Sequence, residues 1–251
     1  MIMTPAFHPP PLTLVTHTLT SDLCKSFCPP PLKKHQVHLW VASLPFLSPL
    51  IPQMLQFLSR RDHQKAQHFF RDEDQRRALV SRGMLRCLLG GYLGSNPRQL
   101  HLAEGPYGKP GLRMAEGGAC LSFNVSHSSD LLLFAFSRYS CVGADVERVR
   151  LMDDALSVAD AFFHPVESAW LRRVHRGGRL AAFFDLWTRK EAYVKATGEG
   201  LSCSLESFSV GEGTDADGYF RVSLPDRGDG VWATGLSFAP AQGYSAAVVA
   251  F

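Results

Sequence analysis

Apolar and polar positions recur along this chain with two different periods. In residues 35–44 (HQVHLWVASL) apolar side chains alternate with their neighbours, which predicts a buried strand. Between about 52 and 93 the apolar positions recur every three or four residues, which predicts helices that stop at Gly90-Gly91. The same reasoning predicts strands at 120–126, 131–136 and 139–147, helices at about 151–161, 166–175 and 181–196, and strands at 207–213, 219–225, 231–238 and 244–251.

The order of these elements, helices followed by strands, occurs twice. This order favours an α+β protein with two similar halves, 37–140 and 141–251, related by a pseudo-twofold axis. Residues 1–36 hold seven of the sixteen prolines, so we expect a proline-rich, irregular N-terminal extension. Ligand sites are common where domains meet, so we expect the active site at the seam between the halves.

Composition and charge narrow the class of protein. The chain has 251 residues, of which 45% are hydrophobic and 20% charged, so it has material for a sizeable core. A net charge of +3 argues against a dedicated nucleic-acid binder but allows local cation clusters that hold small anions. No apolar run has the length of a membrane span, and the six cysteines are sparse enough to be reduced thiols, so we expect a cytoplasmic protein.

Two carboxylates share one face of a predicted strand in GADVE, residues 143–147. Asp145 and Glu147 are two residues apart, so their side chains project from the same side. A hard cation such as Mg²⁺, which takes oxygen ligands, fits such a pair. The alternative is a strand end that enters solvent, with Arg148 and Arg150 neutralising the two acids.

A helix stripe in WTRKEAYVKATG, residues 187–198, carries Trp187, Glu191 and Lys195 at four-residue spacing. A glutamate four residues before a lysine is the favoured surface ion-pair spacing, worth a few tenths of a kcal/mol. Beside the strand pair, however, Glu191 is a third carboxylate for Mg²⁺, and phosphate oxygens would complete the metal's shell. Lys195, one turn further along, would then lie beside the same phosphates.

Other polar side chains could hold an anion or move a proton. Ser126 and His127 follow one another near a strand end, and Lys109 lies in a loop fixed by glycine and proline. Glu167 follows Pro165 at a helix start, where a glutamate is favourable for the helix dipole alone. The alternative for His127 is a core or loop histidine whose hydrogen bonds are made within the protein. The alternative for Lys109 is an exposed loop lysine that contacts only solvent.

The first helical block is dense in cations, with acids among them, so a solvated face is its default interpretation. Within this block, Lys65 and Arg77 could face a phosphate.

Five motifs occur in one order along the chain: GKP, FNVSHS, GADVE, FFHPVE and WTRKEAYVKATGEGLS. Over roughly residues 50–250 the set resembles the 4′-phosphopantetheinyl transferases, specifically the long two-half type that activates peptide and polyketide synthases. The resemblance implies transfer of 4′-phosphopantetheine from coenzyme A to a serine of an apo acyl or peptidyl carrier protein. The other product would be adenosine 3′,5′-bisphosphate, and the reaction would depend on Mg²⁺.

The resemblance also implies roles for individual residues. Asp145, Glu147 and Glu191 would be the Mg²⁺ ligands, and Glu167 the base that takes the proton of the carrier serine. Lys195 would contact the pyrophosphate, with Lys190 assisting charge balance there. The nucleotide's phosphates would be held by Lys109, Ser126 and His127, with the 3′-phosphate at His127. Lys65 and Arg77, which match only by their offset along the first helical block, would also contact the 3′-phosphate.

The expected partners are therefore coenzyme A and an apo carrier protein, without nucleic acid or membrane. Two fused halves make a second subunit unnecessary, so we expect a monomer. Two other classes stay open at this point: a non-catalytic binder of coenzyme A or carrier protein, and a Mg²⁺-dependent phosphohydrolase. No run of residues names the carrier protein or the pathway that the enzyme serves.

Overall fold

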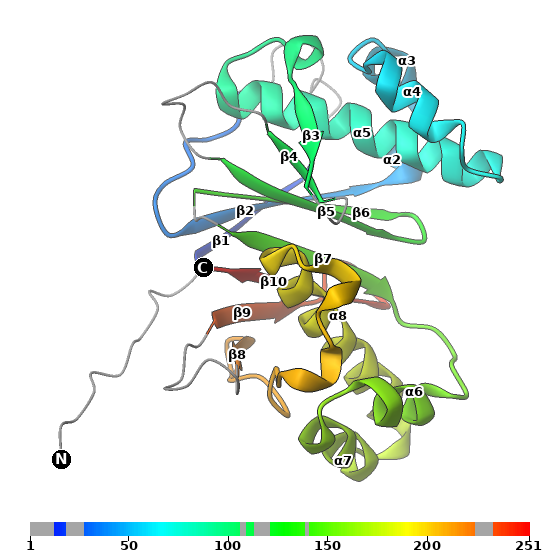
Figure 1. Cartoon of the computed structure of the whole chain (residues 1–251), viewed down its shortest axis with the longest axis vertical. Coiled ribbons are helices and arrows are strands. Elements are labelled where there is room, and N and C mark those ends of the chain that lie inside the picture. The colour runs from blue at the N-terminus through cyan, green and yellow to red at the C-terminus, as the bar shows by residue number, and fades with distance from the viewer. Residues whose placement is uncertain (1–12, 19–27, 106–108, 113–120, 139–140, 224–232) are drawn as a thin grey trace.

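The computed structural model describes residues 13–18, 28–105, 109–112, 121–138, 141–223 and 233–251. Two four-stranded sheets stack face to face within this part of the chain, and helices cover the outer face of each (Figure 1). The two predicted halves of an α+β fold are confirmed.

The N-terminal half holds the first sheet, in the order β1-β2-β6-β5. Its strands are β1 (Thr13–Thr18), β2 (Gln36–Ser43), β6 (Leu131–Ser137) and β5 (Ser122–Ser128). Every residue of β6 is buried, because one face packs on helices and the other on the second sheet. Part of the expected irregular extension is thus ordered, since β1 adds a parallel edge strand to β2.

The helices of this half are shorter and more numerous than the single periodic block suggested. They are α2 (Leu44–Leu47), α3 (Ile51–Leu55), α4 (Arg60–Ala66) and α5 (Asp72–Leu93), and a small sheet of β3 (Leu102–Glu104) and β4 (Pro110–Leu112) lies beside them. Helix α5 passes through Gly90-Gly91 and ends at Gly94, whose φ of 59° is left-handed. A Cβ on Gly90 would lie 2.8 Å from Pro97 Cγ, so this glycine permits close packing and does not stop the helix.

The C-terminal half holds the second sheet, in the order β7-β10-β9-β8. Its strands are β7 (Val142–Arg148), β10 (Tyr244–Ala250), β9 (Ala233–Phe238) and β8 (Tyr219–Val222), and its helices are α6 (Ala155–Phe162), α7 (Pro165–Arg173) and α8 (Arg179–Thr197). The strand expected at 207–213 does not form, and only Ser209 makes an isolated bridge, to Ser223. The ends of the predicted strands at 120, 139–140, 224–225 and 231–232 lie outside the described residues.

Alternation along β7 separates two environments. Val142, Ala144 and Val146 point inward and pack against Val37 and Leu39 of the first sheet. Their neighbours at 143, 145 and 147 project to the other side, toward α8. The acidic residues of GADVE are therefore placed between the second sheet and its covering helix.

Candidate active site

Helix α8 lies directly on strand β7, and Gly143 makes this possible. A Cβ at this position would lie 2.1 Å from the carbonyl oxygen of Ala192 and 2.2 Å from the amide nitrogen of Ala196, both in the helix backbone. The glycine of GADVE thus lets two backbones approach until side chains from α8 reach those of β7. The helix ends at Gly198, whose φ of 77° provides the left-handed cap.

Asp145 lies at the centre of the polar cluster between β7 and α8. Its Oδ1 accepts from Lys195 Nζ at 2.5 Å and from Ser126 Oγ at 2.7 Å. Its Oδ2 is buried and has no hydrogen-bond partner among the residues that the structure describes. An unpaired carboxylate oxygen in a buried position is costly, so this atom is suited to a ligand that supplies positive charge.

Glu147 and Glu191 lie within electrostatic reach of Asp145. Burial raises the pKa of Glu147, and the charge of Asp145 raises it further, although a hydrogen bond from Ser128 at 2.7 Å opposes both. Burial raises the pKa of Glu191 as well, followed by the charges of Asp145 and Glu147. Negative charges this close together would be stabilised by a shared cation.

The three acids do not form a preassembled metal cage. Among the described residues, no three histidine, cysteine, aspartate or glutamate side chains stand together at coordinating distance. The ammonium of Lys195 holds one oxygen of Asp145 instead. The donors nevertheless fit a hard divalent ion, because all are carboxylate oxygens and the buried Asp145 Oδ2 lacks a partner.

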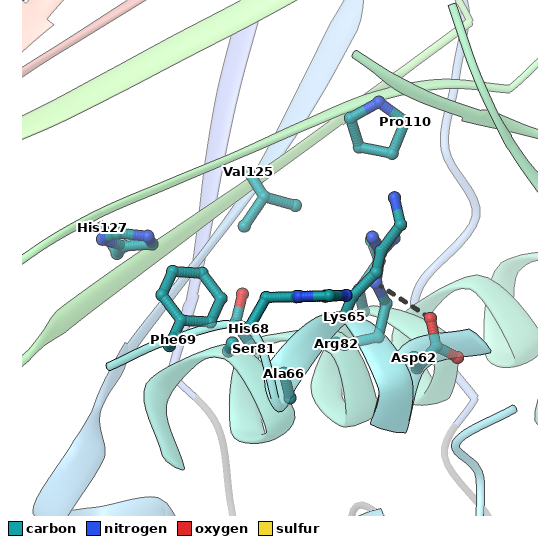
Figure 2. Close-up of a pocket in the computed structure, with 12 residues that line it drawn as sticks. Asp62, Lys65, Ala66, His68, Phe69, Ser81, Arg82, Pro110, Val125 and His127 are labelled. Atoms are coloured by element: carbon teal, nitrogen blue, oxygen red, sulfur yellow. Dashed lines mark ion pairs between the residues drawn. The ribbon is translucent and has the colours of Figure 1, made fainter. Parts of the chain in front are cut away.

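A cavity of about 550 Å³ opens between α4, α5 and strand β5 (Figure 2). One wall is lined by His127 and Val125 of β5 and by Pro110 of β4. The opposite wall comes from the two helices and the segment between them, with the lining residues Asp62, Lys65, Ala66, His68, Phe69, Ala78, Ser81, Arg82 and Leu85. This volume and mixture of aromatic, basic and apolar side chains suit a small anionic ligand.

His127 connects the cavity with the acidic cluster. Its pKa is lowered, first by desolvation and then by the charges of Arg77 and Lys195, while Asp145 acts in the opposite direction. Arg77 pairs with Asp74 at 2.7 Å, and within the described part of the chain its buried Nε has no hydrogen-bond partner. Lys65 lines the same cavity, where desolvation and then Arg61 and Arg82 lower its pKa. The structure thus places Lys65 and His127 on the wall of one cavity, with Arg77 and Lys195 within electrostatic reach of His127.

Lys109 has different partners from the phosphates expected for it. Its Nζ donates to three carbonyl oxygens, those of Lys195 at 2.5 Å, Ala196 at 3.2 Å and Val142 at 3.1 Å. These carbonyls belong to the last turn of α8 and the start of β7, where a cation is favourable for the helix dipole. Lys109 therefore ties a loop of the N-terminal half to the C-terminal half.

Glu167 and Lys190 also differ from expectation. Both side chains are completely buried and form an ion pair of 2.7 Å in the core of the C-terminal half. Lys190 also donates to the carbonyls of Leu205 and Phe208, and Glu167 accepts from the amides of Val210 and His164. With no exposure and with both oxygens bonded, the Glu167 carboxylate is enclosed on all sides, which does not suit a base acting on a docked protein.

Several residues at the site escaped the sequence analysis. Ser128 bonds Glu147, and Arg82 pairs with Asp62 at 3.2 Å on the rim of the cavity. The signal for Ser128 was present as a polar residue at every second position of β5, Asn124, Ser126 and Ser128. Nothing in the sequence distinguished Arg82 from its cationic neighbours.

Comparison with known proteins gives consistent matches. Residues 141–249 match the family described as the 4′-phosphopantetheinyl transferase superfamily, and residues 48–138 match one described as 4′-phosphopantetheinyl transferase, N-terminal. The chain is 39% identical to the 4′-phosphopantetheinyl transferase HetI of Nostoc sp. over 181 residues, 71% of this chain and 75% of that protein. It is 31% identical to psf-1 of Bacillus pumilus over 176 residues, 70% and 72% of the two chains. It is 28% identical to Sfp of Bacillus subtilis over 174 residues, 69% and 74%.

Proposed function

The chain belongs to the 4′-phosphopantetheinyl transferases, which modify carrier proteins, and from this premise we propose a Mg²⁺-dependent transfer from coenzyme A. The acceptor is the serine hydroxyl of an apo acyl or peptidyl carrier protein. The serine oxygen bonds to the β-phosphorus of coenzyme A, and the pyrophosphate bond on that phosphorus breaks. The products are the holo carrier protein and adenosine 3′,5′-bisphosphate.

The observation that carries this proposal is the buried, unpartnered Oδ2 of Asp145 beside two glutamates with raised pKa values. Asp145, Glu147 and Glu191 would hold Mg²⁺, with Glu147 and Glu191 turning toward Asp145. When bound, the ion neutralises pyrophosphate oxygens and makes the phosphorus more electrophilic. Lys195, which neutralises Asp145 in this structure at 2.5 Å, would then turn to the pyrophosphate and stabilise charge on the leaving group.

The nucleotide of coenzyme A would occupy the cavity between α4, α5 and β5. His127 lines this cavity and senses the charges of both Arg77 and Lys195, which supports a phosphate between these cations. The unpartnered Nε of Arg77 is a buried donor that such a phosphate would satisfy. Lys65, on the cavity wall, completes a positive region for the 3′-phosphate.

The carrier serine needs a base, and Glu191 fits this role better than Glu167. Glu191 is half-buried between α8 and β7, beside the proposed metal site, whereas Glu167 is enclosed in the core. A carboxylate that gives one oxygen to a cation keeps a second for the hydroxyl proton. Ser126, bonded to Asp145 and to Lys195 at 3.1 Å, would hold these two groups in place beside the phosphates.

A single chain supplies every group in this mechanism, which supports a monomer. Within the described residues, none of the helices combines the length and apolar character needed to cross a bilayer.

Mass spectrometry of carrier proteins tests the proposal. The full chain is incubated with coenzyme A, MgCl₂ and each of several apo carriers, and the expected result is a phosphopantetheine mass gain together with release of adenosine 3′,5′-bisphosphate. Chelation of Mg²⁺ should abolish the gain, and added Mg²⁺ should restore it. Bound coenzyme A without any gain would instead indicate a binder, and cleaved coenzyme A without a modified carrier would indicate a hydrolase.

Asp145→Asn and Glu191→Gln are the matched variants for the metal and proton-transfer roles. Each keeps the shape of the side chain and removes its charge. Both should lose more than about 100-fold in kcat, as expected when a positioned acid-base or charge-stabilising group is removed. Near-normal turnover by either variant would refute its assignment.

A further inference from the structure

Strand β7 is the outer strand of its sheet, and its free edge faces β5 of the other sheet. An outer strand presents backbone amides that no neighbouring strand satisfies. Here the amides of Ala144, Val146 and Arg148 donate to side chains of β5 at 3.0, 3.3 and 3.1 Å. The acceptors are, in order, Asn124 Oδ1, Ser126 Oγ and Ser128 Oγ. We call these three contacts the seam ladder.

The two serine rungs of the seam ladder do more than accept. Ser126 Oγ donates to Asp145, and Ser128 Oγ donates to Glu147, each at 2.7 Å. A hydroxyl that accepts an amide proton with one lone pair still has its own hydrogen to give. The backbone of β7 therefore fixes where each hydroxyl lies, and the hydroxyl in turn bonds the carboxylate that precedes the donating amide.

The asparagine rung provides an internal comparison. Asn124 accepts the amide of Ala144, but the preceding residue is Gly143, which has no side chain. The hydrogen bond from a β7 amide thus occurs in all three rungs. The hydrogen bond to a carboxylate occurs only in the two rungs where an acidic residue precedes that amide. The backbone contacts join the halves, and the two serines add a separate effect on the acids.

We propose that Ser128 is a positioning residue for Glu147, and that through it the N-terminal half sets the orientation of a carboxylate that binds the catalytic cation. This inference rests on the proposed function, because it assumes that Glu147 is a metal ligand. Groups that hydrogen-bond to metal-binding side chains commonly change metal affinity by about 10- to 100-fold when removed. Ser128 is buried and is not one of the cationic residues proposed to contact phosphates, so its replacement should change the affinity for the metal.

Direct metal binding tests the proposal without using turnover. Mn²⁺ serves as the probe, and its free concentration is followed by electron paramagnetic resonance in the presence of coenzyme A. Ser128→Ala should weaken Mn²⁺ binding about 10-fold, whereas Ser128→Thr, which keeps the hydroxyl, should stay close to the wild type. Asn124→Ala is the matched control: it also removes an acceptor from a β7 amide, yet its Mn²⁺ affinity should stay within about twofold of wild type because no carboxylate loses a donor.

A second variant and a double-mutant cycle keep the test decisive if Ser128→Ala folds poorly. Ser128→Cys keeps the size of the side chain with a weaker donor, so it should weaken Mn²⁺ binding severalfold. In a Glu147→Gln background, Ser128→Ala should have little additional effect, since the group that it orients has lost its charge. Equal Mn²⁺ affinities for wild type, Ser128→Ala and Ser128→Cys would overturn the inference alone. A wild-type protein that binds no Mn²⁺ would overturn it together with the metal assignment, whatever the carrier-loading assay shows.

Discussion

Replacing Glu167 by glutamine distinguishes a chemical role for this carboxylate from a structural one. Its Oε2 lies 2.7 Å from Lys190 Nζ, and both side chains have no exposed surface. Glu167 Oε1 accepts from the Val210 amide at 2.6 Å, while Lys190 donates to two carbonyls, each at 2.8 Å. The Lys190 ammonium also lies 4.4 Å from the centre of the Phe208 ring. The pair thus joins α7, α8 and the segment that precedes β8.

The expected loss of stability follows from leaving one buried charge without its partner. Removing one member of such a pair costs about 3–5 kcal/mol. At about 2–4 °C per kcal/mol for a protein of this size, Tm should fall by roughly 6–20 °C. Gln keeps one amide contact, so Glu167→Gln should lie toward the lower end, and Lys190→Met should be at least as destabilising. The double variant Glu167→Leu/Lys190→Met should lose less than the sum of the single changes, since neither charge is then left alone.

Thermal unfolding and steady-state kinetics, measured on the same preparations, provide the assay. At a temperature where Glu167→Gln is fully folded, kcat for carrier loading should stay within about tenfold of wild type, because the carboxylate is not the base. The reasoning is refuted if Tm is unchanged while kcat falls by about 100-fold or more, since that combination is the signature of a catalytic acid-base group.

Three other perturbations test the same arrangement. Gly143→Ala should destabilise the protein by about 1–3 kcal/mol or more in urea unfolding, because its Cβ would meet Ala192 O at 2.1 Å; Gly213→Ala, with no atom within 4 Å, is the control. The pKa of His127 lies below its ordinary 6.5, so this side chain should gain a proton when a phosphate binds beside it. Calorimetry of coenzyme A binding near pH 6.5, in buffers of different ionisation enthalpy, should therefore show proton uptake. His127→Asn should remove this uptake. Lys109→Met should lower the free energy of unfolding by roughly 2 kcal/mol, because its contacts with three carbonyls are lost. Weaker coenzyme A binding with unchanged stability would instead indicate that Lys109 contacts the phosphates of coenzyme A.

The sequence predicted the site correctly where the relevant side chains lie within a single strand or helix. The two-residue spacing of Asp145 and Glu147 on β7 predicted a shared face, and both side chains lie on the face that is turned toward α8, within reach of Lys195. The four-residue spacing of Glu191 and Lys195 likewise predicted one helix face, and both lie near Asp145. Local periodicity needs only the strand and helix geometry, which the sequence specifies well.

Partners that come from distant segments could not be predicted in this way. Lys109 reaches carbonyls 86 and 87 residues further along the chain, and backbone acceptors have no sequence signature. The burial of Glu167 depends on the packing of α7 against α8 and the following segment. Trp187 contacts the ring of Phe163, at the end of α6, and the ring of Phe183 in its own helix. Such tertiary contacts decide a residue's role after its element is formed.

Two neighbouring residues of the α8 motif consequently face different environments. Lys190 points into the apolar core, where it meets Glu167, whereas Glu191 points toward Asp145 and Glu147. Successive helix positions are about 100° apart, so a buried ion pair at one position fixes the rotation of the helix and thereby the direction of the next side chain. On this argument the core pair and Gly143 perform one task together. The glycine sets how closely α8 approaches β7, and the pair sets which face of α8 is turned to the acids, so together they place Glu191 although neither touches the substrate.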